Sequence, residues 1–353
     1  MNNKEKKGHY LIKRIIASLL LLLLCFIIWQ FKLIIYGIEQ GVGQFKIIYY
    51  SQPIEEVQKD PLFPDSLKQK LALVQEIKAF AIDTLGINNS KNYTTVYNQK
   101  GKPILWVLTA SEKYELKAKE WTFPLLGSVS YKGFFNYEKG LKEQEQLKEQ
   151  GYDTDYDVVG GWSTLGWFKD PILSNMLLKK EGNLANLIIH ELTHGTLYVK
   201  SNVDFNENLA SFVGDKGAEK FLEYKYGKNT DQYQRYEQGK ADMVLYSNHI
   251  LNGAKRLDSL YKAFSAATPV VIKDSLKTKT IKEIIATANN LPFYKKNRFS
   301  KLFKKGELPN NSFFMDYKRY RSKQDFFEKE FKNKFNSDLK KYLQYLKNKY
   351  PTV

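Results

Sequence analysis

The chain of 353 residues contains 55 Lys and Arg against 38 Asp and Glu, which gives a formal net charge of +17, and 43% of its residues are hydrophobic. A chain with this hydrophobic content can bury a substantial core, so a disordered or fibrous protein is excluded. Its length allows one large domain or two small ones. The single cysteine, Cys25, excludes a disulfide within the chain.

The first 36 residues have the pattern of a membrane anchor. Five basic residues precede an apolar run from Ile15 to Trp29, and further apolar residues lengthen it to Tyr36. A helix needs about 20 mostly apolar residues to cross the hydrocarbon core, so the lengthened segment is sufficient. The sequence therefore predicts a basic tail over 1–14, a transmembrane anchor over 15–36 and a folded body over 37–353.

The charges beside this segment predict how it lies in the membrane. Positive charge is concentrated before the span, so we expect a cytoplasmic N-terminus, a single pass through the inner membrane and an extracytoplasmic body. No small-residue cleavage site follows Trp29, which favours a retained anchor over a cleaved signal peptide. A lipoprotein signal at Cys25 is a third possibility, but Leu24 stands where lipoprotein processing expects a small residue.

The first half of the body contains the expected strands. Apolar residues at helical spacing predict a helix over 65–83. The charged, periodic segment 137–150 predicts a second, exposed helix, which Gly151 could terminate. β-branched and aromatic residues predict strands over 92–98, 103–109, 121–135 and 161–168.

The second half of the body has the pattern of helices almost throughout. The expected helices cover 183–199, 206–226, 231–265, 272–288 and 314–348. The fold class is therefore α+β: a mainly helical domain with a small mixed sheet, preceded by one N-terminal transmembrane helix.

The segment HELTH, from His190 to His194, carries the chemistry. Two histidines four residues apart lie one turn apart on the same helix face and can bind one metal ion. Glu191 then stands beside the metal, where it can act as a general base. The alternative is a pair of core histidines satisfied by hydrogen bonds, while His9 and His249 have no partners by spacing and are interpreted as structural.

A hydrolytic zinc site takes three protein ligands, so a third ligand is expected downstream. Glu207, near the start of the next predicted helix, is the best candidate, and Asp204 and Glu219 are alternatives. The sequence thus predicts Zn²⁺ held by His190, His194 and Glu207. Another divalent ion is not excluded, although this ligand set favours zinc.

Several further segments, in the same order, resemble the putative aminopeptidase family of bacteria. The matching segments are PIEEV (53–57), LALVQEIKAFA (71–81), WTFPLLGSVSYKGFF (121–135), GGWSTLGWFKDPILSNML (160–177), IIHELTHGTLYV (188–199), FNENLASFV (205–213) and NNSFFMDYKRY (310–320). The resemblance implies a zincin-like metallopeptidase in which the two histidines bind the metal, Glu191 is catalytic, and Glu207 is the third ligand, as in gluzincins.

The chain also departs from this family. Thr122 and Ser128 stand in a block where many members have cysteines, and the Gly-x-Met-Glu-Asn signature that holds a substrate amino group is absent. A disulfide in this block is therefore not expected, and Leu24 before Cys25 argues against lipidation. The sequence does not independently support exopeptidase activity. The metal site is unaffected.

Other residues are candidates for supporting roles around the metal. We expect 161–168 to offer a strand edge on which a peptide can lie extended. Tyr320, with Tyr317 as alternative, is the candidate donor to the oxyanion. Asn206 is expected to cap its helix, and orienting Glu207 is the alternative role. Asp170 and Glu181 are candidates for binding a substrate ammonium, against an interpretation as ordinary surface charges.

The leading hypothesis is a membrane-anchored zinc metallopeptidase, an aminopeptidase by its resemblance, with its peptidase domain over 37–353. It would hydrolyse peptide bonds with metal-activated water and Glu191 as general base. The alternative is a catalytically silent, metal-binding envelope protein that recognises anionic surfaces or polymers. Residues 300–353 carry fourteen Lys and Arg against six Asp and Glu, which fits either a solvated helical face or contact with an anionic surface. No recognition motif accompanies the charge, so nucleic acid is not expected as a partner.

Overall fold

The computed structural model describes residues 3–124, 127–161, 164, 168–300, 302–303 and 307–350. The chain divides into two compact units, Met1–Tyr50 and Ser51–Val353. Each unit is considered by itself.

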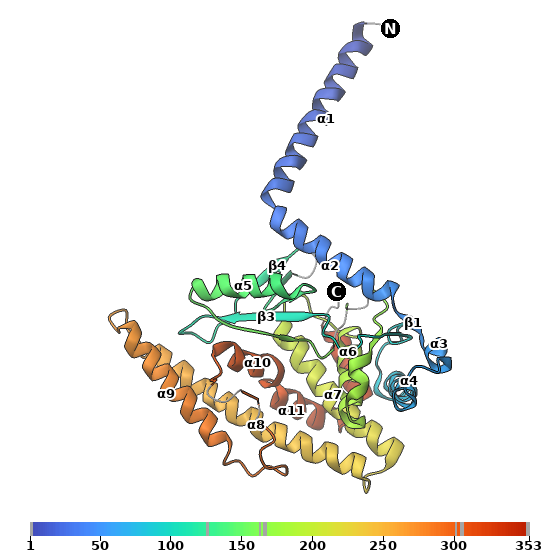
Figure 1. Ribbon diagram of the computed structural model, residues 1–353, viewed down its shortest axis with the longest axis vertical. Helices are drawn as coiled ribbons and strands as arrows, with labels where there is room; N and C mark the ends of the chain where they lie inside the picture. The colour runs from blue at the N-terminus through green and yellow to red at the C-terminus, as the bar shows by residue number, and fades with distance from the viewer. Residues whose placement is uncertain are drawn as a thin grey trace. The chain divides into compact units, whose positions relative to one another are not determined.

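The N-terminal unit consists of helices α1 (Asn3–Trp29) and α2 (Phe31–Tyr49) (Figure 1). The stretch Leu11–Trp29 has a mean hydropathy of 2.6 and is long and apolar enough to cross a membrane, a property that a signal sequence shares. α1 ends at Trp29, so the apolar residues that follow Gln30 belong to the second helix.

The described part of the larger unit contains three small sheets. The central one has strand order β6-β3-β7, with β3 antiparallel to both neighbours in a register that runs from Trp106 opposite Val158 to Ser111 opposite Asp153. The second has order β1-β2-β8, with β2 and β8 parallel, and β4 and β5 form a hairpin. The strands are β1 (Gln52–Pro53), β2 (Thr95–Tyr97), β3 (Trp106–Ser111), β4 (Trp121–Phe123), β5 (Gly127–Val129), β6 (Lys132–Phe134), β7 (Asp153–Val158) and β8 (Ile172–Leu173).

Helices make up most of the larger unit. Their main apolar core is shared by α4, α6, α7, α11 and α12, and a second core joins α8, α9 and α10. The helices are α3 (Ile54–Lys59), α4 (Asp65–Leu85), α5 (Tyr137–Glu149), α6 (Glu181–His194), α7 (Val203–Tyr226), α8 (Asp231–Lys262), α9 (Val270–Ala288), α10 (Asn311–Arg321), α11 (Gln324–Phe335) and α12 (Leu339–Lys349). The predicted α+β, mainly helical class is confirmed, although three small sheets take the place of the single mixed sheet expected from the sequence.

Two predicted elements are divided in the structure. The strand expected over 121–135 becomes β4, β5 and β6, because Gly127 has a positive φ of 76° at the start of β5. The helix expected over 314–348 becomes α10, α11 and α12. Its second break falls at Asn336 and Ser337, both of which adopt left-handed backbone conformations.

Two other predictions, the helix over 183–199 and the strand over 161–168, differ from the structure. α6 ends at His194, five residues earlier than expected, and its last turn contains Thr193, whose hydroxyl donates to the carbonyl of Ile189. In the expected strand 161–168, the described residues Gly161, Thr164 and Phe168 belong to no strand. Residues 162–163 and 165–167 lie outside the described part of the chain.

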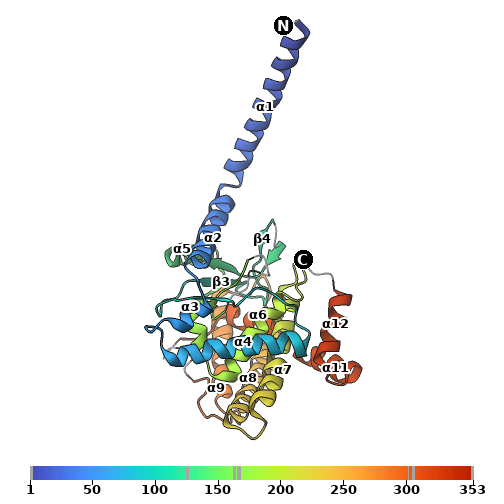
Figure 2. The ribbon, with the colours of Figure 1, turned by 90° about the vertical axis from the view of Figure 1, so that its right-hand side faces the viewer.

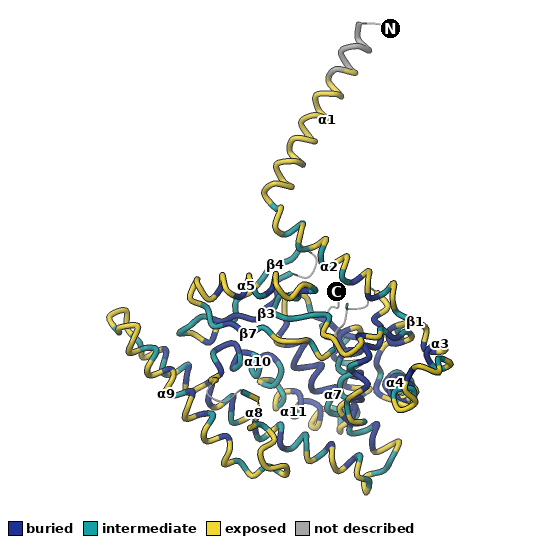
Figure 3. The backbone as a smooth tube through the Cα atoms, in the orientation of Figure 1, coloured by how far each residue is buried: buried dark blue, intermediate teal, exposed yellow. Residues whose placement is uncertain are grey.

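The pair α6 and α7 forms the buried centre of the larger unit (Figures 2 and 3). Glycines allow their close approach: a Cβ atom at Gly214 would stand 3.0 Å from the carbonyl oxygen of Asn186, and one at Gly217 would stand 2.9 Å from the side chain of Ile189. Figure 1 shows α5 on one side of the central sheet and α10 on the other. This packing brings α6, α7, α10 and the central sheet together around one cavity.

Candidate metal centre

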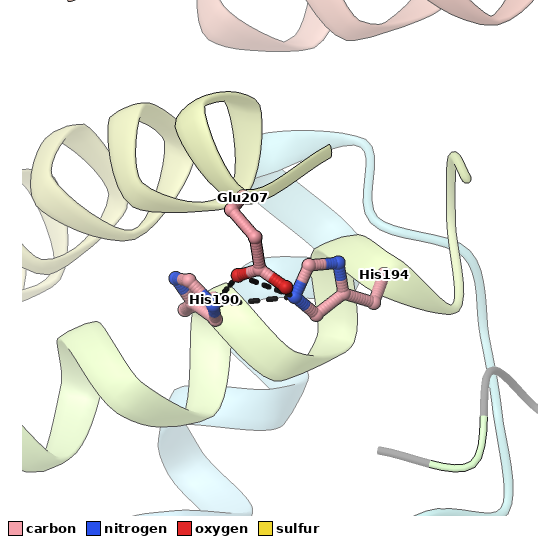
Figure 4. A group of neighbouring side chains, drawn as sticks. All are labelled: His190, His194 and Glu207. Carbon is pink, nitrogen blue, oxygen red and sulfur yellow. Dashed lines mark hydrogen bonds and ion pairs between the residues drawn. The ribbon is translucent and has the colours of Figure 1, made fainter. Parts of the chain in front are cut away.

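Two histidines from α6 and one glutamate from α7 meet at the helix pair (Figure 4). The Nε2 atoms of His190 and His194 lie 3.2 Å apart. The Oε2 atom of Glu207 lies 3.3 Å from Nε2 of His190 and 3.5 Å from Nε2 of His194. The three side chains thus present one carboxylate oxygen and two imidazole nitrogens to a common point, and could hold a metal ion.

The connection between the two helices is fixed by its own hydrogen bonds. The side chain of Asn206 accepts from the backbone N–H of Val199 and donates to its carbonyl, both at 2.8 Å. The N-cap of α7 is Asn202, whose side chain accepts from the N–H of Phe205. The prediction that Asn206 caps this helix is therefore wrong: Asn206 holds the turn that brings Glu207 back over α6.

The spacing of the three ligand atoms fits a tetrahedral zinc ion. Ligands bonded at about 2.0–2.1 Å in a tetrahedron lie roughly 3.3–3.4 Å from one another. The observed separations of 3.2, 3.3 and 3.5 Å bracket that value. Two imidazoles with one carboxylate is also a donor set found in catalytic zinc sites, where the fourth position stays open.

The electrostatics of the cluster keep its carboxylate charged. Burial alone would raise the pKa of Glu207, but the imidazoles of His194 and His190 outweigh it and hold this pKa well below its ordinary value. Burial lowers the pKa of His194, but the Glu207 carboxylate outweighs burial, so this pKa is raised above its ordinary value. The anionic oxygen is thus available to a cation without a proton first having to leave.

Glu191 is buried beside the cluster but is not part of it. Burial raises its pKa, His190 and His194 oppose the rise, and Glu207 adds to it. A Cβ atom at Gly161 would lie 2.7 Å from Oε1 of Glu191, so the chain after β7 passes directly against this carboxylate. Glycine at position 161 therefore leaves room for the carboxylate of Glu191.

A cavity of about 210 Å³ opens on these four side chains. Tyr320 stands in its wall, with its ring 6.4 Å from the ring of His190. Desolvation, with the charge of Glu207 second, holds the pKa of Tyr320 well above its ordinary value, which keeps the hydroxyl protonated. Tyr317, the alternative, packs instead against Tyr246 and Phe313 in the second core.

Three further cavity residues were not expected from the sequence. Tyr198 lies with its ring 6.1 Å from that of His194, and Tyr131 and Arg319 also line the cavity. The guanidinium of Arg319 donates to the hydroxyl and the carbonyl oxygen of Ser130. Tyr198 stands four residues after His194, a spacing that could have placed it on the same side of the motif. No local signal marks the other two.

The remaining predicted residues lie outside the cluster. Asp204 is exposed, Glu219 pairs with Lys240 at 2.8 Å, and Glu181 pairs with Lys70 at 2.6 Å. His249 lies 2.8 Å from the carbonyl oxygen of Ile284, in keeping with a structural role.

Asp170 is not a surface charge. It is 2% exposed, and its carboxylate accepts from both the N–H and the hydroxyl of Thr164, at 2.9 and 2.6 Å, and from the amide of Asn92. These bonds use the carboxylate to hold the backbone that follows Gly161. The interpretation of Asp170 as an ordinary surface charge is therefore wrong, and its contacts are those of a structural residue.

Comparison with known proteins gives one match. The model of the family described as "Putative aminopeptidase" matches residues 35–349. No curated protein and no solved structure matches the chain. Because the match covers most of the chain, including α6, α7 and α10, the protein belongs to the putative aminopeptidase family.

Proposed function

We propose that the protein is a membrane-anchored zinc peptidase of gluzincin type, with a zincin-like body over 37–353, an anchor over 15–36 and a cytoplasmic tail over 1–14. The observation that carries the proposal is the tetrahedral spacing of the His190, His194 and Glu207 ligand atoms beside a buried second carboxylate, Glu191. Family membership supports peptide hydrolysis as the reaction class.

Zinc, when bound by the two histidines and Glu207, would lower the pKa of a water molecule and polarise the scissile carbonyl. Glu191 acts as the general base: it takes a proton from the attacking water and later delivers it to the leaving amine nitrogen. Its raised pKa suits a group that must both accept and release a proton during one turnover.

Tyr320 donates a hydrogen bond to the oxyanion that develops on the substrate carbonyl. Its position in the cavity wall near His190 and its raised pKa support this role, since a donor must keep its proton at the working pH. Tyr131 and Tyr198 line the same cavity and complete an aromatic wall around the reacting carbonyl.

The substrate lies extended along the edge of the central sheet. β7 is an edge strand, and its first residues are covered by α10: the hydroxyl of Ser312 donates to the carbonyl of Asp153, and Asn310 donates to that of Thr154. The segment from Asp157 onward is largely exposed and leads to Gly161, next to Glu191. A peptide added along this segment would have its scissile carbonyl beside the candidate metal site, where the water that Glu191 deprotonates can attack it.

The apolar helix, together with the basic residues before it, supports an inner-membrane location with the body outside the cytoplasm. In that location, an anionic membrane surface or cell-wall polymer would be available for contact with the basic residues near the C-terminus.

The proposal is tested with the full-length protein in detergent and its Glu191→Gln variant, each incubated with a mixed peptide library. We expect the wild type to cleave peptides and the variant, with its metal retained, to be inactive; mass spectrometry of the product ends then distinguishes exopeptidase from endopeptidase activity. Cleavage by neither protein, with metal present in both, would favour a catalytically silent metal-binding protein.

A further inference from the structure

Asn208, the residue that follows Glu207 on α7, connects this helix to α10. We propose that Asn208 is a positioning residue, which sets the place of Tyr320 relative to the Glu207 carboxylate. The inference rests on the proposed function only in assigning the oxyanion contact to Tyr320; the contacts of Asn208 stand independently of it.

Asn208 is fully buried and uses both ends of its side-chain amide. Its Nδ2 donates to the carbonyl oxygens of Arg319 at 2.5 Å and Lys318 at 3.2 Å, in the last turn of α10. Its Oδ1 accepts from the N–H of Lys323 at 2.8 Å, just beyond the end of that helix. The last carbonyls of a helix have no intrahelical partner, so a side chain from α7 here satisfies the C-terminus of α10.

A second residue extends this contact to Tyr320 itself. Nε2 of Gln324 donates to the backbone carbonyl of Tyr320 at 3.1 Å and to that of Asn208 at 2.9 Å. The side chain of Asn208 thus binds the carbonyl of Arg319, which precedes Tyr320. Gln324 binds the carbonyl of Tyr320 and, at the same time, the backbone carbonyl of Asn208. The backbone on both sides of Tyr320 is therefore fixed to the residue next to Glu207.

This arrangement explains why α10 ends where it does. The predicted helix over 314–348 is interrupted after Arg321, and Asn208 binds the two chain ends at this break. In a continuous helix the N–H of Lys323 would bond to the carbonyl of Arg319, and Asn208 would lose its bonds to both sides of the break. Its Nδ2 would then keep the bond to the carbonyl of Asp204 on its own helix, at 2.8 Å. The break thus places Tyr320 at a defined distance from the metal ligand.

Asn311 provides a matched control on the same helix. It is also fully buried, its Nδ2 donates to the carbonyl of Glu112 at 2.8 Å, and its Oδ1 accepts from the hydroxyl of Tyr261. It stands nine residues before Tyr320, roughly 14 Å along α10. Replacing it with alanine removes comparable buried hydrogen bonds without touching the end of α10 near the metal.

The test compares Asn208→Ala, Asn311→Ala and Tyr320→Phe, and the double variant Asn208→Ala with Tyr320→Phe, in the full chain. We expect Asn208→Ala to lower kcat on the order of 100-fold with zinc content and KM little changed, because a donor misplaced by about 1 Å loses most of its effect. In the Tyr320→Phe background the same change should lower kcat by less than about threefold. Gln324→Ala, on a half-buried side chain, is the milder variant should Asn208→Ala not fold, and should lower kcat several-fold in wild type only.

A fluorotyrosine introduced at position 320 gives a readout that does not depend on cleavage. Its ¹⁹F resonance should shift or broaden in Asn208→Ala and remain that of the wild type in Asn311→Ala. An unchanged resonance in Asn208→Ala, or an equal fall of kcat with and without the Tyr320 hydroxyl, would overturn the positioning role. If the wild type cleaves no peptide, the proposed function fails, and the resonance alone decides the inference.

Discussion

The candidate centre has two halves that differ in how the chain builds them. His190, Glu191, His194 and Glu207 lie within eighteen residues of sequence, on two consecutive helices joined by one short turn. Tyr320, by contrast, reaches the centre on α10, more than a hundred residues later. The half that would bind the metal therefore depends on local geometry, whereas the half that would stabilise the oxyanion depends on long-range packing. Substitutions in the two halves should accordingly have different consequences.

The largest effect is expected in the metal-binding half. His194→Ala removes one of the three proposed ligands, and metal affinity should fall by more than the roughly 10–100-fold typical of losing an outer-shell partner. Zinc measured by mass spectrometry after dialysis should be substoichiometric, and cleavage should be lost with it. Full zinc occupancy in this variant would remove His194 from the ligand set.

The next effect separates metal binding from proton transfer. Glu191→Gln keeps the shape of the side chain but removes the base, so kcat should fall by about 10²–10⁴. Zinc content should remain at the wild-type level, since Glu191 does not belong to the cluster of His190, His194 and Glu207. A variant that retains most of its kcat would contradict the role assigned to Glu191.

A smaller effect is expected where β7 leads into the centre. In Gly161→Ala, the new methyl group would meet the Oε1 atom of Glu191 at 2.7 Å and a methyl of Leu187 at 2.6 Å, both at the ends of flexible side chains. We expect little change in the free energy of unfolding and a fall of kcat on the order of tenfold, because Glu191 must move. Thermal unfolding and steady-state kinetics on the same samples check this; a large loss of stability with kcat unchanged would count against it.

The smallest effect concerns Asp316, on α10. Desolvation raises the pKa of its carboxyl to about 6; Arg319 opposes the rise, and Asp155 adds to it. A folded-state pKa above the unfolded value means that the folded protein binds more protons, so this group lowers stability as the pH rises from about 4 to about 6.

The Asp316→Asn variant should lack this dependence. Relative to the variant, the wild type should lose about 1–2 kcal/mol of unfolding free energy across this range, after allowance for the 31% exposure of the carboxylate side chain. Urea unfolding of both proteins at several pH values gives the difference. A difference that is constant with pH, or that grows in favour of the wild type, would contradict the raised pKa.

The sequence predicted the local features of the fold and of the site. The helix over 65–83 corresponds to α4, and the spacing within HELTH is enough to place His190 and His194 on one face of α6. The third candidate ligand, Glu207, could also be predicted from the sequence, because a short connection brings the start of α7 back beside α6.

Features that depend on distant contacts could not be predicted. Helical periodicity continues through 314–348, and nothing within that segment shows that Asn208 will bind the two ends of a break in it. Arg319 reaches the cavity because α10 packs against the central sheet, and Tyr131 reaches it from the connection between β5 and β6. Asp170 looks like one more charge on a basic chain until its partners, Thr164 and Asn92, are known.

The most direct test of the central claim is X-ray absorption spectroscopy at the zinc edge of the full-length protein, purified without added metal and reconstituted with one equivalent of zinc. We predict a four-coordinate ion bound only by nitrogen and oxygen, at about 2.0–2.1 Å, with the scattering pattern of two imidazoles. Failure of the protein to retain zinc, or a first shell without two imidazoles, would contradict it.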